Sequence, residues 1–581
     1  MRGVDISILR RFDAEPGLQW LVCACAMIFP ITVLTVNRAD SLVLFLLGII
    51  GVYAIFRWGV RDIGLNKQEI LLIWVFLGWY AAIVLCYLIG DKTDTGFKLL
   101  GRNLRLIFFV PAFIACRRYL TKPRLLFIGL VLAPFVILSV ALWQFMHAKG
   151  YVRAGGVVEI IPFGDFSMAM AFMAIAWLQF TAGSRAIWRF LVAGAALSAG
   201  MIASVLSETR GGWLAMPVLL FVTAIILSRR SGKRGIKVFL MCMVFAVLAF
   251  LLVPRTIILD RTDGAVQNIE NYVDYMKLIN MDHAGCMDRK LFSEALAREI
   301  VKYNYSKSIS VSVVKDDDGL ARSGLSKFCE HGNMIKLTNL DTGNRVTVFV
   351  KRSSVIPDGL QKIRFVIRGS GKISISRRGK RHWDKFDNEQ YSIVDYAQEV
   401  KEPAWAYFWV PANGTIYFAP VQNTPGEYVF PFANGSAGQR LEMWRAAWHI
   451  FKQHPLFGAG TGSFMAEVGK LARTGDISPS VIGYDHPHND YLNALSSQGL
   501  LGLISYLLVM GYPFLLFYRA LWSDDDKVRS AGFCGVVMIA GLLIFGLTET
   551  MFTHSIVMSW YVTFSAMLMA IIFRKKDIEI K

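Results

Sequence analysis

The sequence predicts an all-α polytopic membrane protein into which an all-β module is inserted, and three observations support this class. Of the 581 residues, 54% are hydrophobic and only 18% are charged, which differs strongly from soluble proteins. Apolar runs of about 20 residues recur in both terminal parts of the chain. The middle part instead contains short runs in which apolar and polar residues alternate, as they do in β-strands.

The apolar runs number about twelve, and each approaches the length at which a helix crosses a hydrocarbon core. The first is too long for the apolar core of a signal peptide and lacks a clean cleavage site, so we expect it to remain as a span. The runs cover residues 18–36, 41–57, 70–90, 104–116, 125–146, 164–183, 187–207, 212–228, 236–254, 499–518, 530–548 and 553–573.

The distribution of Lys and Arg predicts that both termini lie in the cytoplasm. With the N-terminus inside, the inner short segments and the termini hold 24 Lys and Arg residues, whereas the outer short segments hold about seven. An even number of spans then places residues 255–498 on the outer side. That segment carries 30 basic and 26 acidic residues, a balance that argues against a nucleic-acid-binding surface.

Residues 305–432 predict an inserted β-sandwich-like module. The runs "ISVSVV", "NRVTVFVKR", "QKIRFVIRG", "KISISRRG", "WAYFWV" and "TIYFAP" alternate, and turn-like stretches such as "RGSGK" and "PANGT" lie between them. The aromatic residues of "WAYFWV" could stack on sugar rings, but packing inside the module is the favoured interpretation. In the same outer segment, Cys286 and Cys329 could form a disulfide.

The chain therefore has four predicted parts. Residues 1–254 form the first nine spans, and residues 255–437 form the outer segment with the β module. Residues 438–498 are helical, because Trp444 and Trp448 belong to an apolar stripe of helical spacing. The "GAGTG" sequence in this part lacks the Lys-Ser/Thr of a P-loop, so we expect a tight turn there. Residues 499–581 form the last three spans and a cytoplasmic tail.

The densest polar cluster of the chain, "DHPHNDYLN", directly precedes the tenth span. His488 could accept a proton from a hydroxyl group without a metal ion. Alternatively, Asp485, His486 and Asp490 could bind a divalent metal ion. A third possibility is that His488 only caps the span, although Asn489 or Asp490 is better suited to that role.

Three stretches together resemble the O-antigen ligase and polymerase superfamily: "SETRGGW" (207–213), "QRLEMWRAAWHIFKQHPLFGAGTGSF" (439–464) and "HPHNDYLNALSSQGLLG" (486–502). The family pattern joins a histidine and a small polar amide to two glycines. His488, Asn489, Gly499 and Gly502 match it at the family's spacing. With the spans and the large loop before the tenth, the resemblance covers the chain except for the β module.

The resemblance implies a GT-C-like membrane glycosyltransferase that acts at the periplasmic face of the bacterial inner membrane. We interpret the protein as an O-antigen ligase of lipopolysaccharide biosynthesis, which transfers a glycan from undecaprenyl diphosphate to lipid A-core with inversion. An O-antigen polymerase or a protein O-oligosaccharyltransferase would share the fold. A lipid-linked glycan transporter is a further alternative, disfavoured because no internal repeat is visible.

The resemblance also implies the site residues. His488 is the expected base, and Arg210 and Arg440 are expected to bind the diphosphate, because a guanidinium group can hold phosphate oxygens bidentately. Without the motif, Arg210 would be read as an interfacial arginine that contacts lipid phosphates. We expect neither a metal ion nor a cofactor. The expected substrate-binding residues are Arg445, Asn489, His486, Arg102 and Arg153.

Overall fold

The computed structural model divides the chain into two compact units, which are described separately. The first comprises residues 1–261, 447–464 and 485–581, and the second comprises residues 262–446 and 465–484. The structure describes residues 15–147, 153–180, 186–231, 240, 243–245, 247, 266, 269, 272–273, 309–315, 333–342, 346–351, 360–376, 384–399, 405–421, 436–474, 476–477 and 481–574. The predicted pair Cys286 and Cys329 lies outside these residues.

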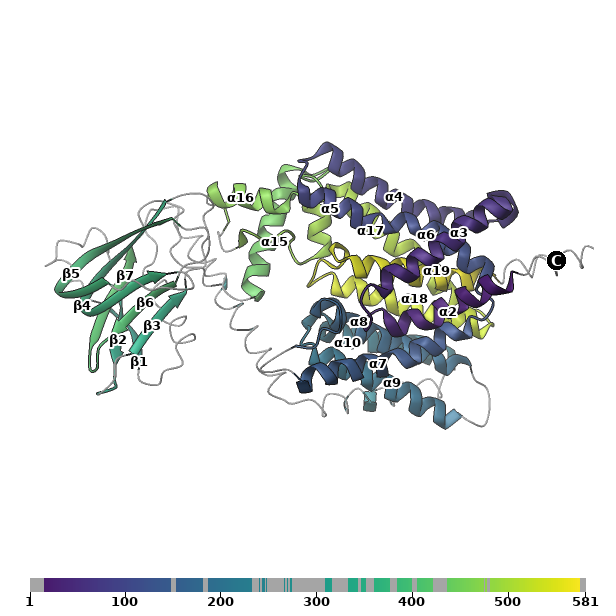
Figure 1. Cartoon of the computed structure of the whole chain (residues 1–581), viewed down its shortest axis with the longest axis horizontal. Coiled ribbons are helices and arrows are strands. Elements are labelled where there is room, and N and C mark those ends of the chain that lie inside the picture. The colour runs from purple at the N-terminus through teal and green to yellow at the C-terminus, as the bar shows by residue number, and fades with distance from the viewer. Residues whose placement is uncertain are drawn as a thin grey trace, which may run out of the picture. The chain divides into compact units, whose positions relative to one another are not determined.

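The first unit is built from apolar helices, as expected for a polytopic membrane protein (Figure 1). Its helices include α2 (Pro16–Thr32), α3 (Ala39–Ile63), α4 (Lys67–Ile89), α5 (Asp94–Asn103), α6 (Arg105–Tyr119), α7 (Arg124–His147), α8 (Ile160–Met173), η1 (Ala174–Phe180), α9 (Ala186–Leu206), α10 (Arg210–Ser231), α17 (Asp490–Ala520), α18 (Asp526–Phe545), η5 (Met551–Thr553) and α19 (Ser555–Arg574).

Among the described residues, ten helices are long and apolar enough to cross a membrane. The shorter apolar helix α2 corresponds to the first predicted span and has 17 residues. The predicted span 236–254 lies mostly outside the described residues. The number of twelve spans therefore stays a prediction.

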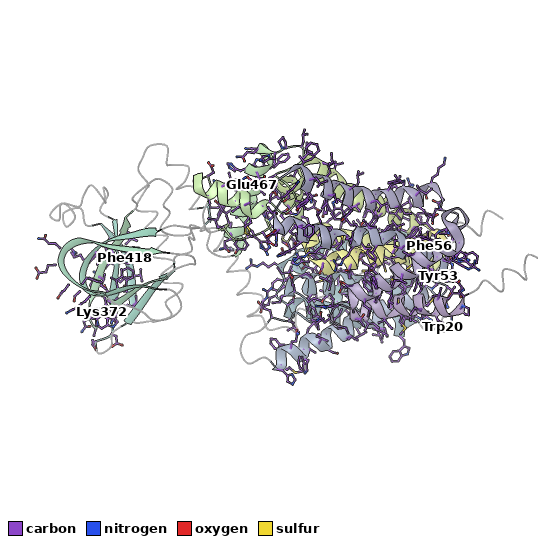
Figure 2. All side chains as sticks on the ribbon, turned by 45° about the horizontal axis from the view of Figure 1, so that its top comes forward. Trp20, Tyr53, Phe56, Lys372, Phe418 and Glu467 are labelled. Atoms are coloured by element: carbon purple, nitrogen blue, oxygen red, sulfur yellow. The ribbon has the colours of Figure 1, made fainter. Side chains whose placement is uncertain are left out.

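The helix α19 lies at the centre of the helical unit, because 94% of its most apolar stretch is buried. Its Tyr561 stacks with Phe76 of α4, which in turn stacks with Phe109 of α6 at a ring distance of 3.8 Å. At the surface, aromatic side chains such as Trp20 and Phe56 project outward (Figure 2). Large exposed apolar side chains of this kind are typical of helices that face lipid.

One glycine shapes the first part of α17. Gly499 has a φ of +64° and kinks the helix, and a β-carbon added there would lie 2.5 Å from the carbonyl carbon of Leu456. Only glycine tolerates both this backbone conformation and this close approach. The expected tight turn at "GAGTG" is present, because Ser463 N donates to Gly460 O at 3.1 Å. In addition, Ala459 N donates to Ser496 O at 2.9 Å, and Gly460 N donates to Ser497 O at 3.1 Å. The turn thereby fastens the chain to the first part of α17.

The second unit contains the predicted β module. Its seven strands are β1 (Ile309–Lys315), β2 (Asn333–Asn339), β3 (Val346–Lys351), β4 (Leu360–Ser376), β5 (Asp384–Glu399), β6 (Trp405–Val410) and β7 (Thr415–Val421). All belong to one hydrogen-bonded sheet in the order β1-β2-β7-β4-β6-β3, with β5 on the other edge of β4. The first half of β4 pairs with β7 and the second half with β6, so this strand joins two groups of strands.

The predicted turn at "RGSGK" is wrong, because β4 runs through it. The register shifts between Ile367 and Gly369, and Gly369 has a φ of +116°, so the strand bends there without ending. The strands β2 and β5 were not predicted. The favoured packing role of "WAYFWV" is confirmed for Phe408, which is buried and stacks on Phe418 at 4.4 Å.

The second unit also holds the first part of α15 (Ser436–Gln453) and α16 (Phe464–Thr474). The helix α15 confirms the helical pattern predicted from residue 438 onward. The predicted boundaries at residues 254, 437 and 498 stay predictions.

Candidate functional site

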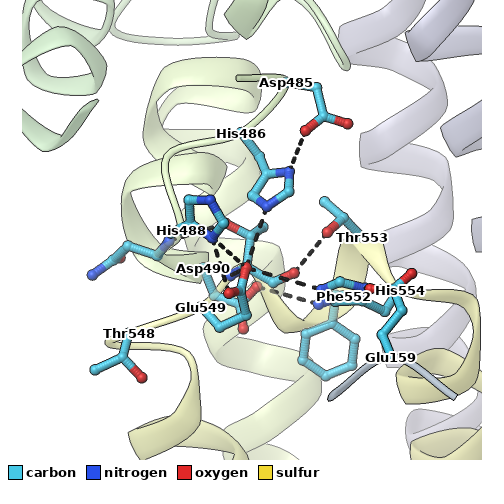
Figure 3. A network of polar contacts seen from close by, with 12 residues as sticks. Glu159, Asp485, His486, His488, Asp490, Thr548, Glu549, Phe552, Thr553 and His554 are labelled. Carbon is cyan, nitrogen blue, oxygen red and sulfur yellow. Dashed lines mark hydrogen bonds and ion pairs between the residues drawn. The ribbon is translucent and has the colours of Figure 1, made fainter. Parts of the chain in front are cut away.

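The polar cluster before α17 surrounds one carboxylate, that of Glu549 (Figure 3). Nδ1 of His488 lies 2.7 Å from Glu549 Oε1 and 2.9 Å from Oε2. Nε2 of His486 lies 3.2 Å from the same Oε1 atom. Glu549 is almost fully buried, whereas the two histidines are partly accessible. Both predicted histidines therefore converge on an acid from the loop between α18 and α19.

Further charged residues extend this cluster on both sides. Nδ1 of His486 lies 2.6 Å from Asp485 Oδ1. Nδ1 of His554 lies 2.6 Å from Glu159 Oε2, and its Nε2 lies 3.9 Å from Glu549 Oε1. Imidazole and carboxylate groups thus alternate from Asp485 to Glu159, just before α8 (Figure 3).

The electrostatics of the cluster favour charged pairs. Burial alone would lower the pKa of His486, but hydrogen bonds with Asp485 and Glu549 raise it to about 9. His554 behaves in the same way, with Glu159 and Glu549 as partners, and its pKa also rises to about 9. Burial would raise the pKa of Glu549, but the histidine hydrogen bonds hold it well below its usual range. At neutral pH, His486 is therefore protonated and cannot act as a base.

The local backbone explains how the cluster is assembled. The Asn489 side chain caps α17 by accepting a hydrogen bond from Leu492 N at 3.0 Å. Its Nδ2 donates to Leu547 O at 3.0 Å, and its backbone N donates to Thr550 Oγ1 at 3.0 Å. These contacts hold the loop with Glu549 against the start of α17. Asn489 thus has a positioning role, and its predicted contact with substrate stays a prediction.

His488 itself has a φ of +50°, in the left-handed region that non-glycine residues rarely occupy. Such a conformation costs on the order of 1–3 kcal/mol and is found preferentially at functional sites. The second non-glycine residue of this kind near the site is Glu208 in "SETRGG", with a φ of +54°. Two of the three motif stretches therefore contain a strained residue.

Sequence reasoning missed Glu549, His554 and Glu159. Each stands alone in the sequence, and Glu549 lies 61 residues after His488, so no spacing pattern connects them. One signal was available. The predicted topology places the short segment between the last two spans on the same side as His488, and Glu549 is the acid in that segment.

The residues at the centre could also hold a metal ion. One ligand atom each from His486, His488 and Glu549 lie within 4.8 Å of one another. Two imidazoles and one carboxylate suit zinc and similar divalent ions. This set differs from the one that the sequence suggested, because Asp490 Oδ1 accepts a hydrogen bond from Phe552 N at 3.4 Å instead. The predicted absence of a metal ion stays a prediction.

Three predicted arginines belong to the helical unit. Arg102 Nη1 donates to Thr553 O at 3.1 Å, which places Arg102 beside His554. Arg153 Nε donates to Ser207 O at 2.9 Å and Nη2 donates to Glu208 O at 3.2 Å, so Arg153 braces the "SETRGG" segment. Arg210 is the first residue of α10.

The segment of Arg210 is linked to the cluster through its neighbour. Thr209 Oγ1 donates to Ile160 O at 3.3 Å, and the residue before Ile160 is Glu159, the partner of His554. The start of α10 and the histidine cluster therefore lie at the same end of the helical unit.

Arg440 and Arg445 belong to the second unit. Arg445 donates to the buried Glu442 from Nη2 at 2.7 Å and from Nε at 3.1 Å. The hydroxyl of Tyr272 also donates to Glu442, at 3.0 Å. Arg445 therefore has a structural partner. Arg440 is partly accessible and lies near Tyr484, whose pKa is raised by burial and lowered in part by the Arg440 charge.

Residues 406–507 match the model of the family described as O-antigen ligase. This segment of the chain is therefore similar to the O-antigen ligase family. The matched segment contains Arg440, His486 and His488, but it ends before Glu549. An uncharacterized protein of Haemophilus influenzae is 25% identical over 139 residues, which are 24% of this chain and 34% of that protein. The chain therefore spans about a third of the length of this relative.

Proposed function

We propose that the protein is a membrane glycosyltransferase of the ligase type, which transfers a glycan from a lipid diphosphate to a hydroxyl group of an acceptor. The observation that carries this proposal is the His488–Glu549 pair at the start of α17, within reach of solvent. The O-antigen ligase match supports the reaction class, because His488 lies inside the matched segment. The multiple apolar helices support a lipid-linked donor.

In the proposed reaction, His488 is the general base and Glu549 is its positioning residue. An ionised carboxylate only accepts hydrogen bonds, so Nδ1 of His488 carries the proton that faces Glu549. Nε2 is then the atom that accepts the proton of the acceptor hydroxyl. The acceptor oxygen forms a bond with the anomeric carbon while the bond between that carbon and the diphosphate oxygen breaks. Attack opposite the leaving group inverts the anomeric configuration.

The departing diphosphate requires cations. We assign this role to Arg210 and Arg440, whose planar guanidinium groups suit phosphate oxygens. Protonated His486 adds positive charge next to the base, and Arg102 adds a further cation beside His554. No nucleotide or other cofactor is required in this scheme, because the carrier diphosphate is already a good leaving group.

Within the superfamily, we propose an O-antigen ligase whose donor is an undecaprenyl-diphosphate-linked polysaccharide and whose acceptor is lipid A-core. The proposed location is the bacterial inner membrane, with both termini cytoplasmic and the active site periplasmic. A polymerase would use a growing polymer as acceptor, and a protein O-oligosaccharyltransferase would use a protein.

A deletion strain distinguishes these acceptors. A missing ligase leaves lipid A-core without polymer while long carrier-linked polymer accumulates. A missing polymerase leaves single carrier-linked repeats, and a missing protein transferase leaves lipopolysaccharide unchanged. Transfer by the purified protein should also persist in EDTA. If EDTA abolished transfer and a divalent ion restored it, His486, His488 and Glu549 would be metal ligands instead.

A further inference from the structure

A groove lies on the outside of the helical unit, where α3 meets the junction of α5 and α6. Arg105 Nη2 donates to Ser41 Oγ across it at 3.2 Å. The groove has a volume of about 430 Å³, within the range of ligand-binding pockets. Apolar side chains form most of its wall, with Leu42, Phe45 and Leu104 partly exposed within it. Gly101 leaves part of the wall open, because a β-carbon added there would meet no atom within 4 Å.

Arg38 lies at the groove in an unfavourable position. It directly precedes α3 and has a φ of +60°, which is rare for residues other than glycine. A cation at the N-terminus of a helix is also disfavoured by the helix dipole. Within the described ranges, no hydrogen bond or ion pair of the Arg38 side chain is present, and the residue is exposed. An anionic group bound from outside would offset these costs.

The groove is connected to the histidine cluster by two arginines. Arg105 lines the groove, and its Nε donates to Ser559 Oγ of α19 at 2.8 Å. Arg105 Nη1 donates to Arg102 O at 3.1 Å, and Arg102 Nη1 donates to Thr553 O at 3.1 Å. Thr553 precedes His554 of the cluster. One wall of the groove is therefore bonded to the loop that carries Glu549 and His554.

We propose that this groove holds the prenyl chain of the diphosphate-linked donor and that Arg38 contacts its phosphate end. Apolar walls with an exposed guanidinium suit an amphiphile that has a long hydrocarbon chain and an anionic phosphate. The connection to the histidine cluster favours the donor over a phospholipid of the surrounding bilayer. The inference rests on the proposed function, since it assigns the site of that function's donor.

Two variants test the groove without disturbing the core. In Gly101→Leu, the new side chain fills the groove and meets no protein atom at its β-carbon. The matched control is Gly78→Leu in α4, another exposed helical glycine with open space around it. In Arg38→Gly, the guanidinium is removed while the left-handed backbone is retained without strain.

The experiment uses full-length protein in phosphatidylcholine nanodiscs and an undecaprenyl-diphosphate glycan with a diazirine on its first isoprene units. We expect crosslinks to peptides of α3 and α5–α6, and competition by undecaprenyl phosphate but not by phosphatidylglycerol. Gly101→Leu and Arg38→Gly should each reduce crosslinking by about tenfold or more, and Gly78→Leu should not.

Crosslinks that map to other helices, or that survive in Gly101→Leu, would overturn the inference. Equal competition by phosphatidylglycerol would instead identify an ordinary site for anionic membrane lipids and would also overturn it. Because crosslinking does not require turnover, these results are separate from a test of the proposed function. If the protein transferred glycan but the crosslinks mapped elsewhere, only the assignment of the groove as the donor site would be refuted. If the crosslinks mapped to the groove but no acceptor received glycan, only the proposed glycosyltransferase function would be refuted.

Discussion

Glu549 receives hydrogen bonds from two histidines and lies near a third, so its charge organises the candidate site. A buried carboxylate is stable only when cations or donors compensate for lost hydration. His486 and His554 supply that compensation as imidazolium groups. His488 is thereby left as the histidine whose Nδ1–H faces the carboxylate while its other nitrogen can take part in proton transfer.

The raised histidine pKa values predict how stability depends on pH. The pKa of His486 and His554 is about 9 in the folded protein, against about 6.5 for an unperturbed histidine. Their stabilisation is therefore fully present below about pH 6.5 and is lost as the pH rises through 9. The thermal midpoint of the detergent-solubilised protein should fall between pH 6 and 9.5.

The variant His486→Gln should make this fall smaller, because one of the two titrating groups is gone. His454→Gln removes an exposed histidine outside the cluster and should leave the fall unchanged. At the acid end, the low pKa of Glu549 predicts a loss of stability as the pH drops below about 4.5. A midpoint that stays constant or rises between pH 6 and 9.5 would contradict the proposed charge states.

The diphosphate assignment predicts that lysine cannot replace Arg210 or Arg440. Arg210→Lys and Arg440→Lys keep the charge but lose the planar pair of donors, so transfer should fall by about tenfold or more at normal membrane levels of protein. Arg445→Lys is the comparison, because Arg445 already pairs with Glu442 and its substitution should mainly lower stability. If Arg210→Lys and Arg440→Lys both retained full transfer, Arg210 and Arg440 would not be the residues that bind the diphosphate.

At the scale of single elements, the kink in α17 lets this helix lie close to the backbone of Leu456. Gly499→Ala should destabilise the protein by more than about 2 kcal/mol, because it combines a left-handed backbone with an overlap at Leu456. Gly511→Ala in the same helix meets no atom within 4 Å and should change stability by no more than about 1 kcal/mol. Thermal unfolding measures both. Equal effects of the two substitutions would show that the kink is not required.

The elements that the sequence predicted correctly are those with a local pattern. The alternation in "TIYFAP" predicted β7. The polar stretch before α17 drew attention to His488, whose role as a base stays a prediction. The bend at Gly369 was misread as a turn, because a glycine-rich stretch inside a strand has the same composition as a loop. Glu549 and Glu159 were missed because their role comes from tertiary contacts between helix ends, which no local spacing encodes.

At the scale of the whole molecule, the charge distribution predicts that both chain termini share the cytoplasmic side. A green fluorescent protein fused after Arg574 should fluoresce, and alkaline phosphatase inserted at the turn 411–414 of the β module should be active. These reporters work only inside and only outside the cytoplasm, respectively. A protein without fluorescence, or without phosphatase activity, would contradict the predicted topology.

The central claim is that His488, held by Glu549, is the base of glycan transfer. The most direct test is single-turnover transfer from a synthetic undecaprenyl-diphosphate glycan to lipid A-core, at equal protein level and saturating donor. We expect His488→Ala and Glu549→Gln to lose roughly 10²–10⁴-fold in rate while donor binding remains, and His486→Ala to lose less. An inactive His486→Ala together with an active His488→Ala would contradict the account, because the base would then be the histidine that we infer to be protonated.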